Sequence, residues 1–432
     1  MLRRDFFANA GRTAAGLWAA TSFLRPGRAA AAPLKVPEDG RVGPRDEKFW
    51  AQVRRQFPLT GKRAYLNTGG LGASPQASID ALQEKIDALE EISEVGHNHK
   101  LWQRIKTKAG RVLGCGPDEV CYTRNTTEGA NIVCNGLPLR RGDEVITTTH
   151  EHVGNTLAWL ARQKREGIVV KTFTPSTSSA DENLERLEAL MTPRTRALSL
   201  SHVTCSTGQV LPVRAIGRLA RERGIWYFVD GAQAAGHLPV DVKAIGCHAY
   251  ATSGHKWLLG PKGTGLLYVD QEAQEAIEPK FVGAYSGSGA WDMISTGEFE
   301  FTPTAQRYEY GTVSAPLFVG LEAAIDFVER IGVDNIWARD HAMAAHLMEG
   351  LDRLGATLLS PRAADEHSGI VTFRIDEMPY QKLQGFLGKE YKLRTRGIYE
   401  GGLNGLRVSL HLYNSFAEVE KVLEGVAAAQ KA

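Results

Sequence analysis

The sequence predicts an α/β protein with a mainly parallel sheet covered by helices on both faces, followed by a smaller α+β domain. Between residues 118 and 256, short apolar segments alternate with single helical segments. Strands separated by one helix form right-handed crossovers in a largely parallel sheet. Polar and charged residues follow several of these segments. Ligands bind at the carboxyl ends of the strands in such sheets, so these residues are candidate site residues.

Length and composition are those of an ordinary globular enzyme-sized chain. The 432 residues suffice for a large core and a second domain. Hydrophobic residues make up 43%, charged residues 23%, and the net charge is +2. Basic residues are scattered, so we expect no nucleic-acid partner. No segment reaches the roughly 20 apolar residues of a membrane span, so we expect no stable membrane anchor.

The first 32 residues differ in character from the rest. Arg3 and Arg4 precede a weakly apolar, alanine-rich run, which ends in four alanines at 29–32. This layout predicts a twin-arginine signal peptide over residues 1–32. A disordered basic tail is the alternative. The export machinery is therefore an expected partner, and we expect a periplasmic or exported protein.

The mature chain is expected to have three parts. Residues 33–63 form an N-terminal arm, residues 64–315 a large domain, and residues 316–432 a linking helix with a small C-terminal domain. Helical periodicity predicts helices near residues 47–57, 75–95, 100–113, 154–164, 180–191, 213–223, 317–354, 380–387 and 415–428. Apolar runs predict strands near residues 64–67, 120–122, 143–148, 169–173, 197–202, 225–230, 249–253, 266–269, 370–375, 392–396 and 406–412.

Two of these strands end in reactive groups. The strand 225–230 ends in Asp230, and the strand that starts at Ala249 leads to Lys256. A buried lysine is desolvated, so its amine titrates nearer neutrality and can attack a carbonyl. Enzymes that use pyridoxal 5′-phosphate (PLP) combine a lysine Schiff base with a carboxylate on the pyridinium nitrogen. Lys256 and Asp230 are therefore candidates for a PLP site.

The segments Val229-Asp230-Gly231-Ala232-Gln233 and Ser253-Gly254-His255-Lys256 resemble those of the class V aminotransferase family. The resemblance extends from about Tyr65 to the C-terminus. It implies fold-type I PLP enzymes, a family that includes cysteine desulfurases, isopenicillin N epimerases and several lyases. Within the family, the segment Val203-Thr204-Cys205-Ser206-Thr207-Gly208 resembles the isopenicillin N epimerase-like branch more closely.

The resemblance implies a role for each site residue. Lys256 is the expected catalytic base and acid, Asp230 the partner of the ring nitrogen, and Gln233 a donor to the ring oxygen. Ser253 and His255 are expected phosphate contacts. The remaining cofactor residues implied are Thr126, Thr127, His152 and Thr312.

Simpler interpretations exist for some of these residues. Thr126 and Thr127 begin a helix, where they suit either a phosphate or an N-cap. His152, expected to stack on the cofactor ring, follows Glu151 and could be an ordinary loop imidazole. We expect no metal site here, because the other ligand types are missing. Thr312 is expected to reach the phosphate of a neighbouring subunit, which would make the protein a homodimer.

The substrate carboxylate is expected to bind an arginine, whose guanidinium matches a carboxylate with two parallel hydrogen bonds. The segment Leu406-Arg407-Val408-Ser409-Leu410 resembles the family strand that supplies this group. Arg407 is the first candidate and Arg396 the second, while a surface ion pair is the alternative for either.

The reaction is expected to start at the α-carbon of an amino acid or of an amino-acid unit in a secondary metabolite. Residues 397–405 contain no cysteine, which disfavours a persulfide-forming desulfurase. Transamination is our first expectation. Its expected setting is the periplasmic maturation of a pyoverdine-type siderophore. An epimerase and a cysteine-sulfoxide-type C–S lyase are the enzymatic alternatives. A non-catalytic binding protein on the same fold is the alternative from another class.

Overall fold

The computed structural model describes residues 33–93, 98–292 and 297–432. The predicted twin-arginine signal lies outside the described residues. Residues 35–432 form one compact unit, to which all of the described helices and strands belong. None of the described helices combines the length and apolar character needed to cross a bilayer.

The described residues contain the following α-helices: Glu47–Arg55 (α1), Gln76–Glu91 (α2), His99–Leu113 (α3), Thr126–Gly136 (α4), Val153–Glu166 (α5), Ala180–Leu190 (α6), Val213–Glu222 (α7), Val242–Ile245 (α8), Ala315–Ile331 (α9), Val333–Arg353 (α10), Tyr380–Glu390 (α11) and Phe416–Ala429 (α12). The strands are Ala64–Tyr65 (β1), Val120–Thr123 (β2), Glu144–Thr148 (β3), Val169–Phe173 (β4), Thr195–Ser201 (β5), Trp226–Asp230 (β6), Ala249–Ser253 (β7), Gly265–Val269 (β8), Gly287–Asp292 (β9), Glu298–Phe301 (β10), Thr357–Leu358 (β11), Ile370–Arg374 (β12), Leu393–Arg394 (β13), Arg396–Ile398 (β14) and Gly405–Ser409 (β15).

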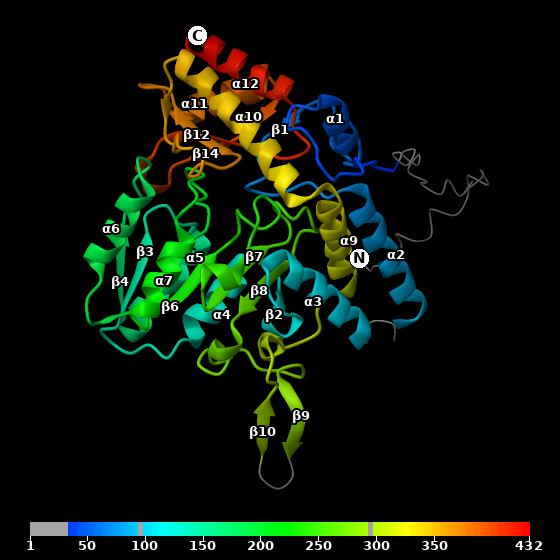
Figure 1. Ribbon diagram of the computed structural model, residues 1–432, viewed down its shortest axis with the longest axis vertical. Coiled ribbons are helices and arrows are strands. Elements are labelled where there is room, and N and C mark those ends of the chain that lie inside the picture. Colours follow the sequence, from blue (N-terminus) through cyan, green and yellow to red (C-terminus); the bar gives the residue numbers. More distant parts are fainter. Residues whose placement is uncertain (1–32, 94–97, 293–296) are drawn as a thin grey trace, which may run out of the picture. The chain divides into compact units, whose positions relative to one another are not determined.

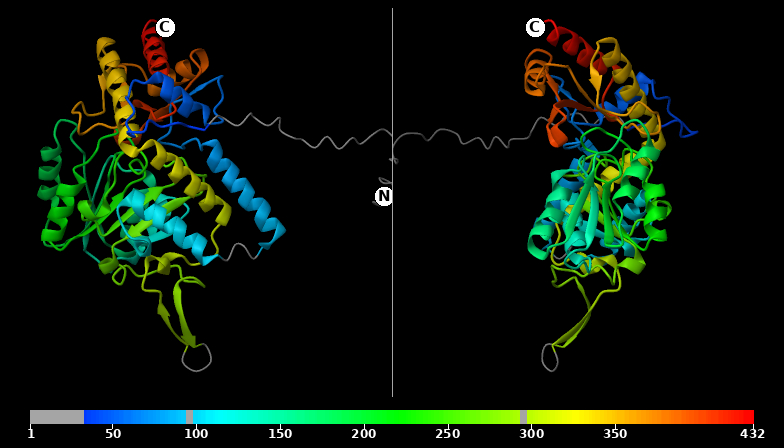
Figure 2. Two further views of the ribbon diagram at one scale, coloured as in Figure 1. Left: turned by 45° about the vertical axis from the view of Figure 1, so that its right-hand side comes forward. Right: turned by 90° about the vertical axis from the view of Figure 1, so that its left-hand side faces the viewer.

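The largest sheet has seven strands in the order β2-β8-β7-β6-β5-β3-β4. Strands β3 to β7 pair in parallel, whereas β8 runs antiparallel to both of its neighbours. Helices cover both faces of this sheet, as the edge-on view shows (Figure 2). Two apolar clusters pack on its two faces, which explains why nearly all residues of its inner strands are buried. The predicted fold class is confirmed.

A second sheet has four antiparallel strands in the order β11-β12-β15-β14. Helices α10, α11 and α12 pack with it around a separate apolar cluster (Figure 1). The short strand β1 pairs in parallel with β13, so an N-terminal segment joins the C-terminal part of the fold. The division into an arm and two domains remains a prediction, although the two sheets have their own cores.

Three expectations about elements were wrong. The single helix expected over 317–354 is broken at Gly332, whose φ of 87° lies in a region that favours glycine and separates α9 from α10. The strand expected over 392–396 is two strands, β13 and β14, which belong to different sheets. Residues 281–301, where no element was expected, contain the antiparallel hairpin β9–β10, which extends away from the large sheet (Figure 1).

Candidate active site

The predicted acid and lysine lie beside each other at the carboxyl edge of the large sheet. Asp230 is the last residue of β6 and pairs in register with Ala251 of β7. Lys256 lies in the turn that follows Ser253, the last residue of β7. Neighbouring parallel strands end at the same edge, so the two side chains, which are far apart in sequence, share one site.

A cavity of about 310 Å³ opens at this edge. It is lined by Gly69, Gly70, Asn125, Thr126, Thr127, His152, Cys205, Asp230, Ala232, Gln233, Ser253, His255, Lys256, Arg396 and Arg407. Every predicted site residue except Thr312 is therefore brought to one cavity. Their individual roles remain predictions.

Burial shifts the pKa of both Lys256 and Asp230 toward the neutral form. It lowers the pKa of the Lys256 amine, an effect that the nearby Asp230 partly offsets. It also raises the pKa of Asp230, against the opposing effects of Lys256 and of the Ala232 amide, which donates a hydrogen bond to Asp230 Oδ1 at 2.9 Å. A lysine in this state is a better nucleophile than a solvated one. A cation placed beside a buried acid stabilises its ionised form.

The N-terminus of α4 forms one wall of the cavity. Asn125 caps the helix by accepting a hydrogen bond from the Glu128 amide at 2.9 Å. The hydroxyls of Thr126 and Ser253 lie 2.7 Å apart, which joins the helix to the end of β7. Backbone amides at a helix N-terminus and the helix dipole favour an anion. Thr126, Thr127 and Ser253 therefore suit a phosphate.

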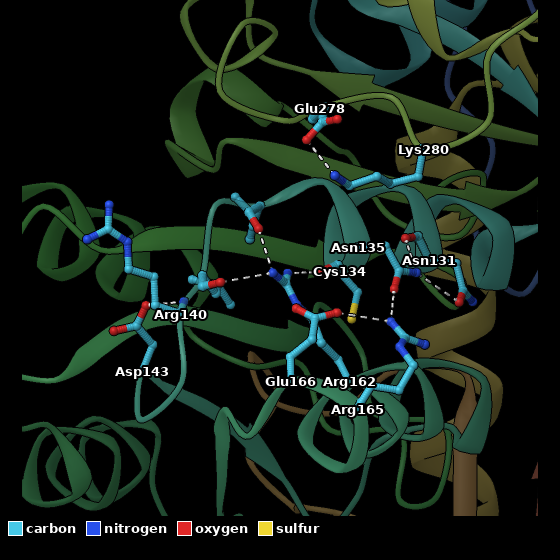
Figure 3. Close-up of polar contacts among 12 residues, drawn as sticks. Asn131, Cys134, Asn135, Arg140, Asp143, Arg162, Arg165, Glu166, Glu278 and Lys280 are labelled. Atoms are coloured by element: carbon cyan, nitrogen blue, oxygen red, sulfur yellow. Dashed lines mark hydrogen bonds and ion pairs between the residues drawn. The ribbon is translucent and has the colours of Figure 1, made fainter.

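The other end of α4 is fixed by an arginine of α5 (Figure 3). Arg162 is only 4% exposed. Its guanidinium donates hydrogen bonds to the carbonyls of Cys134, Leu137 and Leu139. Its Nε also pairs with Glu166 at 2.7 Å. These bonds give a charged donor to carbonyls in and just after the last turn of α4, where a helix leaves carbonyls without intrahelical partners. Arg162 thereby sets the position of the helix whose first turn lines the cavity.

His152 is the N-cap of α5, and its Nδ1 accepts a hydrogen bond from the Gly154 amide at 3.1 Å. Since Nδ1 accepts, the neutral ring carries its proton on Nε2. Burial lowers the pKa of His152 to about 4, so the ring is neutral at pH 7. A Cβ at Gly154 would lie 2.4 Å from Thr127 Oγ1 and 3.0 Å from His152 Nδ1. Only glycine allows His152 and Thr127 to approach this closely.

Arg407, on β15, is 1% exposed. Its Nη1 donates to the Cys205 carbonyl at 2.7 Å and its Nη2 to Asn67 Oδ1 at 3.0 Å. Within the described residues Arg407 has no carboxylate partner, and its buried Nε has no acceptor. Burial, together with the charge of Arg396, lowers its pKa to about 10. A buried guanidinium without a counter-ion is a site for an anion.

Arg396 has a different environment, because its guanidinium pairs with the carboxylate of Glu400. Its side chain is 26% exposed. The alternative considered from the sequence, an ion pair, is therefore present for Arg396 and absent for Arg407 among the described residues. Arg407 is the stronger candidate for the substrate carboxylate.

Gln233 and His255 have bonds that set their orientation. The Trp257 indole donates to Gln233 Oε1 at 2.8 Å, and Gln233 Nε2 donates to the Gly69 carbonyl at 3.0 Å. The amide nitrogen, which carries two hydrogens, therefore lies on the side of Gly69. His255 Nδ1 lies 3.1 Å from the Thr264 carbonyl, which assigns its proton to Nδ1.

Thr312 does not line the cavity around Lys256 of its own chain. It lines a separate cavity of about 580 Å³ with Lys106 and Glu309, which form a buried ion pair at 2.8 Å. A contribution of Thr312 to the site of a second copy remains a prediction.

Sequence reasoning missed two residues that orient the site, Asn67 and Trp257. Asn67 bonds Arg407, and Trp257 bonds Gln233. Asn67 stands directly before the glycine-rich segment 68–72, but no local signal links it to an arginine 340 positions away. All five cysteines are free, and Cys205, in the cavity wall, is held protonated because burial raises its pKa to about 11.

The fold and the site together define an α/β enzyme of the type that binds a carbonyl cofactor through lysine. The aminotransferase class V family model matches residues 65–422, and the chain belongs to this family. The family uses PLP, so the predicted cofactor is confirmed at the level of the family. The residues present fit this group: a desolvated lysine, a buried acid, a helix N-terminus with hydroxyls and a neutral imidazole surround one cavity.

Relatives named for different activities are similar to this chain. The probable cysteine desulfurase of Pyrococcus abyssi is 29% identical over 90% of this chain and 96% of its own length. The isopenicillin N epimerase of Streptomyces clavuligerus is 30% identical over 87% of this chain and 97% of its own length. A structure of C-DES with glycine covalently linked to its PLP cofactor has 28% identity and a TM-score of 0.78, and the match covers 87% of this chain and 98% of that chain.

Proposed function

We propose that the protein is a PLP-dependent enzyme that acts at the α-carbon of an amino acid, or of an amino-acid unit in a larger metabolite. The observation that supports this most directly is the location of Arg407. It is a buried cation without a carboxylate partner among the described residues, and it lines the same cavity as Lys256 and Asp230. An amino acid offers one carboxylate to Arg407 and one amine to the cofactor.

Each residue has a task that follows from its environment. Lys256 would bind the cofactor carbonyl through its desolvated amine and, when the substrate amine frees it, would move the proton at the substrate α-carbon. Asp230 would hold the proton of the ring nitrogen, His152 would lie against the ring, and the first turn of α4 would hold the phosphate. When bound, PLP supplies an electron sink for negative charge at that carbon.

Transamination remains our proposal for the reaction, with periplasmic siderophore maturation as its proposed setting. Epimerisation is the second candidate, favoured by the 30% identity with the Streptomyces clavuligerus epimerase. A C–S lyase is the third, supported by the similarity to C-DES, which is a cystine C–S lyase. Desulfuration through a persulfide is disfavoured because residues 397–405, which precede Arg407, contain no cysteine.

Export through the twin-arginine route and homodimerisation are also proposals. The first is supported by Arg3, Arg4 and the alanine run at 29–32. The second is supported by the location of Thr312 outside its own Lys256 cavity and by the exposure of the large apolar side chains Phe281, Val282 and Tyr310.

An absorption spectrum of the purified protein with PLP tests the proposal. Wild type should show a near-ultraviolet to visible band that shifts when a substrate amino acid is added. Lys256→Ala should abolish the band, and Lys262→Ala, in the same glycine-rich turn, should keep it. Assays for keto acid, inverted amino acid and pyruvate then separate the three reactions. If wild type shows no band, the enzymatic proposal fails and a binding protein on this fold remains.

A further inference from the structure

A group of buried polar side chains lies directly behind Lys256, and only one of its members, Gln233, lines the cavity. It consists of Gln233, His237, Trp257, Asp340 and His411, and none of these is more than 2% exposed. Trp257 follows Lys256 in the chain, Asp340 comes from α10, and His411 follows β15. The group therefore connects the lysine turn to the C-terminal part of the fold.

Hydrogen bonding determines where the protons in this group lie. His411 Nε2 lies 3.1 Å from the Trp257 carbonyl, which can only accept, so Nε2 carries a proton. His411 Nδ1 lies 2.7 Å from Asp340 Oδ2, so one proton is shared by these two atoms. Burial raises the pKa of Asp340 well above its usual range and lowers that of His411 to about 3. The shared proton therefore resides on Asp340, which donates to a neutral imidazole.

The other carboxyl oxygen of Asp340 is consistent with a proton on this acid. Asp340 Oδ1 is buried and has no hydrogen-bond partner within the described part of the chain. Burying an oxygen without a hydrogen-bond partner costs less free energy when it is the carbonyl oxygen of a neutral acid than when it belongs to a charged carboxylate.

His237 fixes the Trp257 side chain from the other side. Its ring stacks on the indole with 3.8 Å between centroids and 6° between planes. His237 Nε2 accepts from the Gly369 amide at 3.0 Å, so its Nδ1 donates to the Gln233 carbonyl at 3.0 Å. The indole in turn bonds Gln233 Oε1. Trp257 is thus held at its side chain by His237 and Gln233, and at its carbonyl by His411.

We propose that Asp340 and His411 are positioning residues that hold the Trp257 carbonyl, and through it the backbone of Lys256, in the geometry that lets Lys256 bind the cofactor. This inference rests on the proposed function. Neither residue lines the cavity, so both act through Trp257. Misplacement of a reacting group by even 1 Å can cost about a hundredfold in rate. A single buried hydrogen bond can therefore have a measurable effect on the lysine.

The test compares matched variants by the rate at which the absorption band appears when cofactor-free protein is mixed with PLP. Asp340→Asn keeps a neutral donor to His411 Nδ1, and Asp340→Leu keeps a branched side chain but has no donor. His411→Gln keeps a donor for the Trp257 carbonyl, and His411→Leu removes it. His248→Ala is the control for stability, because it removes a 3.0 Å bond from the Tyr227 amide at the opposite end of β7.

We expect the two leucine variants to capture PLP roughly tenfold more slowly than wild type. Asp340→Asn and His411→Gln should remain within about threefold of wild type. His248→Ala should lower the thermal midpoint without changing the capture rate. If a leucine variant does not fold, Asp340→Asn still tests the proton assignment. A PLP capture rate tenfold below that of wild type would contradict a protonated, neutral Asp340.

Equal capture rates in wild type and both leucine variants would overturn the inference while leaving the proposed function intact. A wild type that forms no band with PLP would instead show that the proposed function itself is wrong. The two failures are therefore distinguishable within one series of measurements.

Discussion

Gly72 lies directly against the carbonyl of Lys256. A Cβ built on Gly72 would lie 1.9 Å from that oxygen, and the Gly72 amide donates to the His255 carbonyl at 2.8 Å. The N-terminal loop 68–72 therefore packs onto the backbone of the lysine turn without room for a side chain.

Replacing Gly72 by alanine should displace one of these two backbones. We expect Gly72→Ala to destabilise the protein by about 1–3 kcal/mol and to reduce the bound PLP. Urea unfolding and cofactor content by absorption measure both effects. Gly43→Ala is the control, since a Cβ there meets nothing within 4 Å. Equal stability and equal PLP content in the two variants would show that the loop 68–72 can move to accommodate a side chain at Gly72 without cost.

Arg407 should control the affinity for the substrate carboxylate. Lysine keeps the charge but cannot bind with two parallel hydrogen bonds, so Arg407→Lys should weaken amino-acid binding about 10- to 100-fold. Binding is measured by the spectral shift of the PLP-loaded protein on titration with amino acid. Arg374→Lys, on the exposed end of β12, serves as the control. The same weakening for an amine without a carboxylate would argue against a carboxylate site at Arg407.

Buried histidines should make the fold sensitive to acid. Burial lowers the pKa to about 4 for His150, His152, His202, His237 and His367, and to about 3 for His411. The unfolded chain, with a histidine pKa near 6.5, binds these protons first. Their contribution to stability is therefore present above about pH 6.5 and is lost as the pH falls toward 4.

Glu151 acts in the opposite direction. Burial raises its pKa to about 7, although Ser201 and Thr148 donate hydrogen bonds to it. Its contribution is complete below its unfolded pKa of about 4.3 and is lost as the pH rises through 7. Burial also raises the pKa of Asp230, Glu309 and Asp340, which act in the same direction as Glu151. These four acids are outnumbered by the six histidines, so the free energy of unfolding should fall between pH 6.5 and 4.5.

Urea midpoints across this range measure the slope. His367→Asn should reduce the slope of the unfolding free energy against pH by up to about 1.4 kcal/mol per pH unit, which is the effect of one proton taken up on unfolding. A slope that His367→Asn leaves unchanged would show that this histidine titrates alike in both states.

Two arginines of α5 should differ sharply in their effect on stability (Figure 3). Arg162→Met leaves three buried carbonyls at the end of α4 without their charged donor, whereas Arg165 is 56% exposed and bonds Asn135 and Glu166. We expect about 2–4 kcal/mol of destabilisation for Arg162→Met and less than about 1 kcal/mol for Arg165→Met. Urea unfolding of both variants tests this, and similar losses would contradict the role assigned to Arg162.

Much of the large sheet was predictable from local pattern. The strands and helices between residues 118 and 269 are short and regular, and apolar periodicity identifies such elements well. Asp230 and Lys256 were predictable as neighbours for the same reason, since each follows a strand and parallel strands end at one edge. Gly332, in contrast, ends a helix that hydrophobic spacing alone would continue.

Residue type and spacing thus determined the α/β class, the lysine and acid of the site, and the family. Tertiary packing decided which groups complete that site. The pairing of Asn67 with Arg407 and of Asp340 with His411 joins residues that no local pattern relates, and both pairs exist because distant strands and helices bury them together. A buried polar group must find a partner in the folded chain, and sequence spacing carries no record of which partner that is.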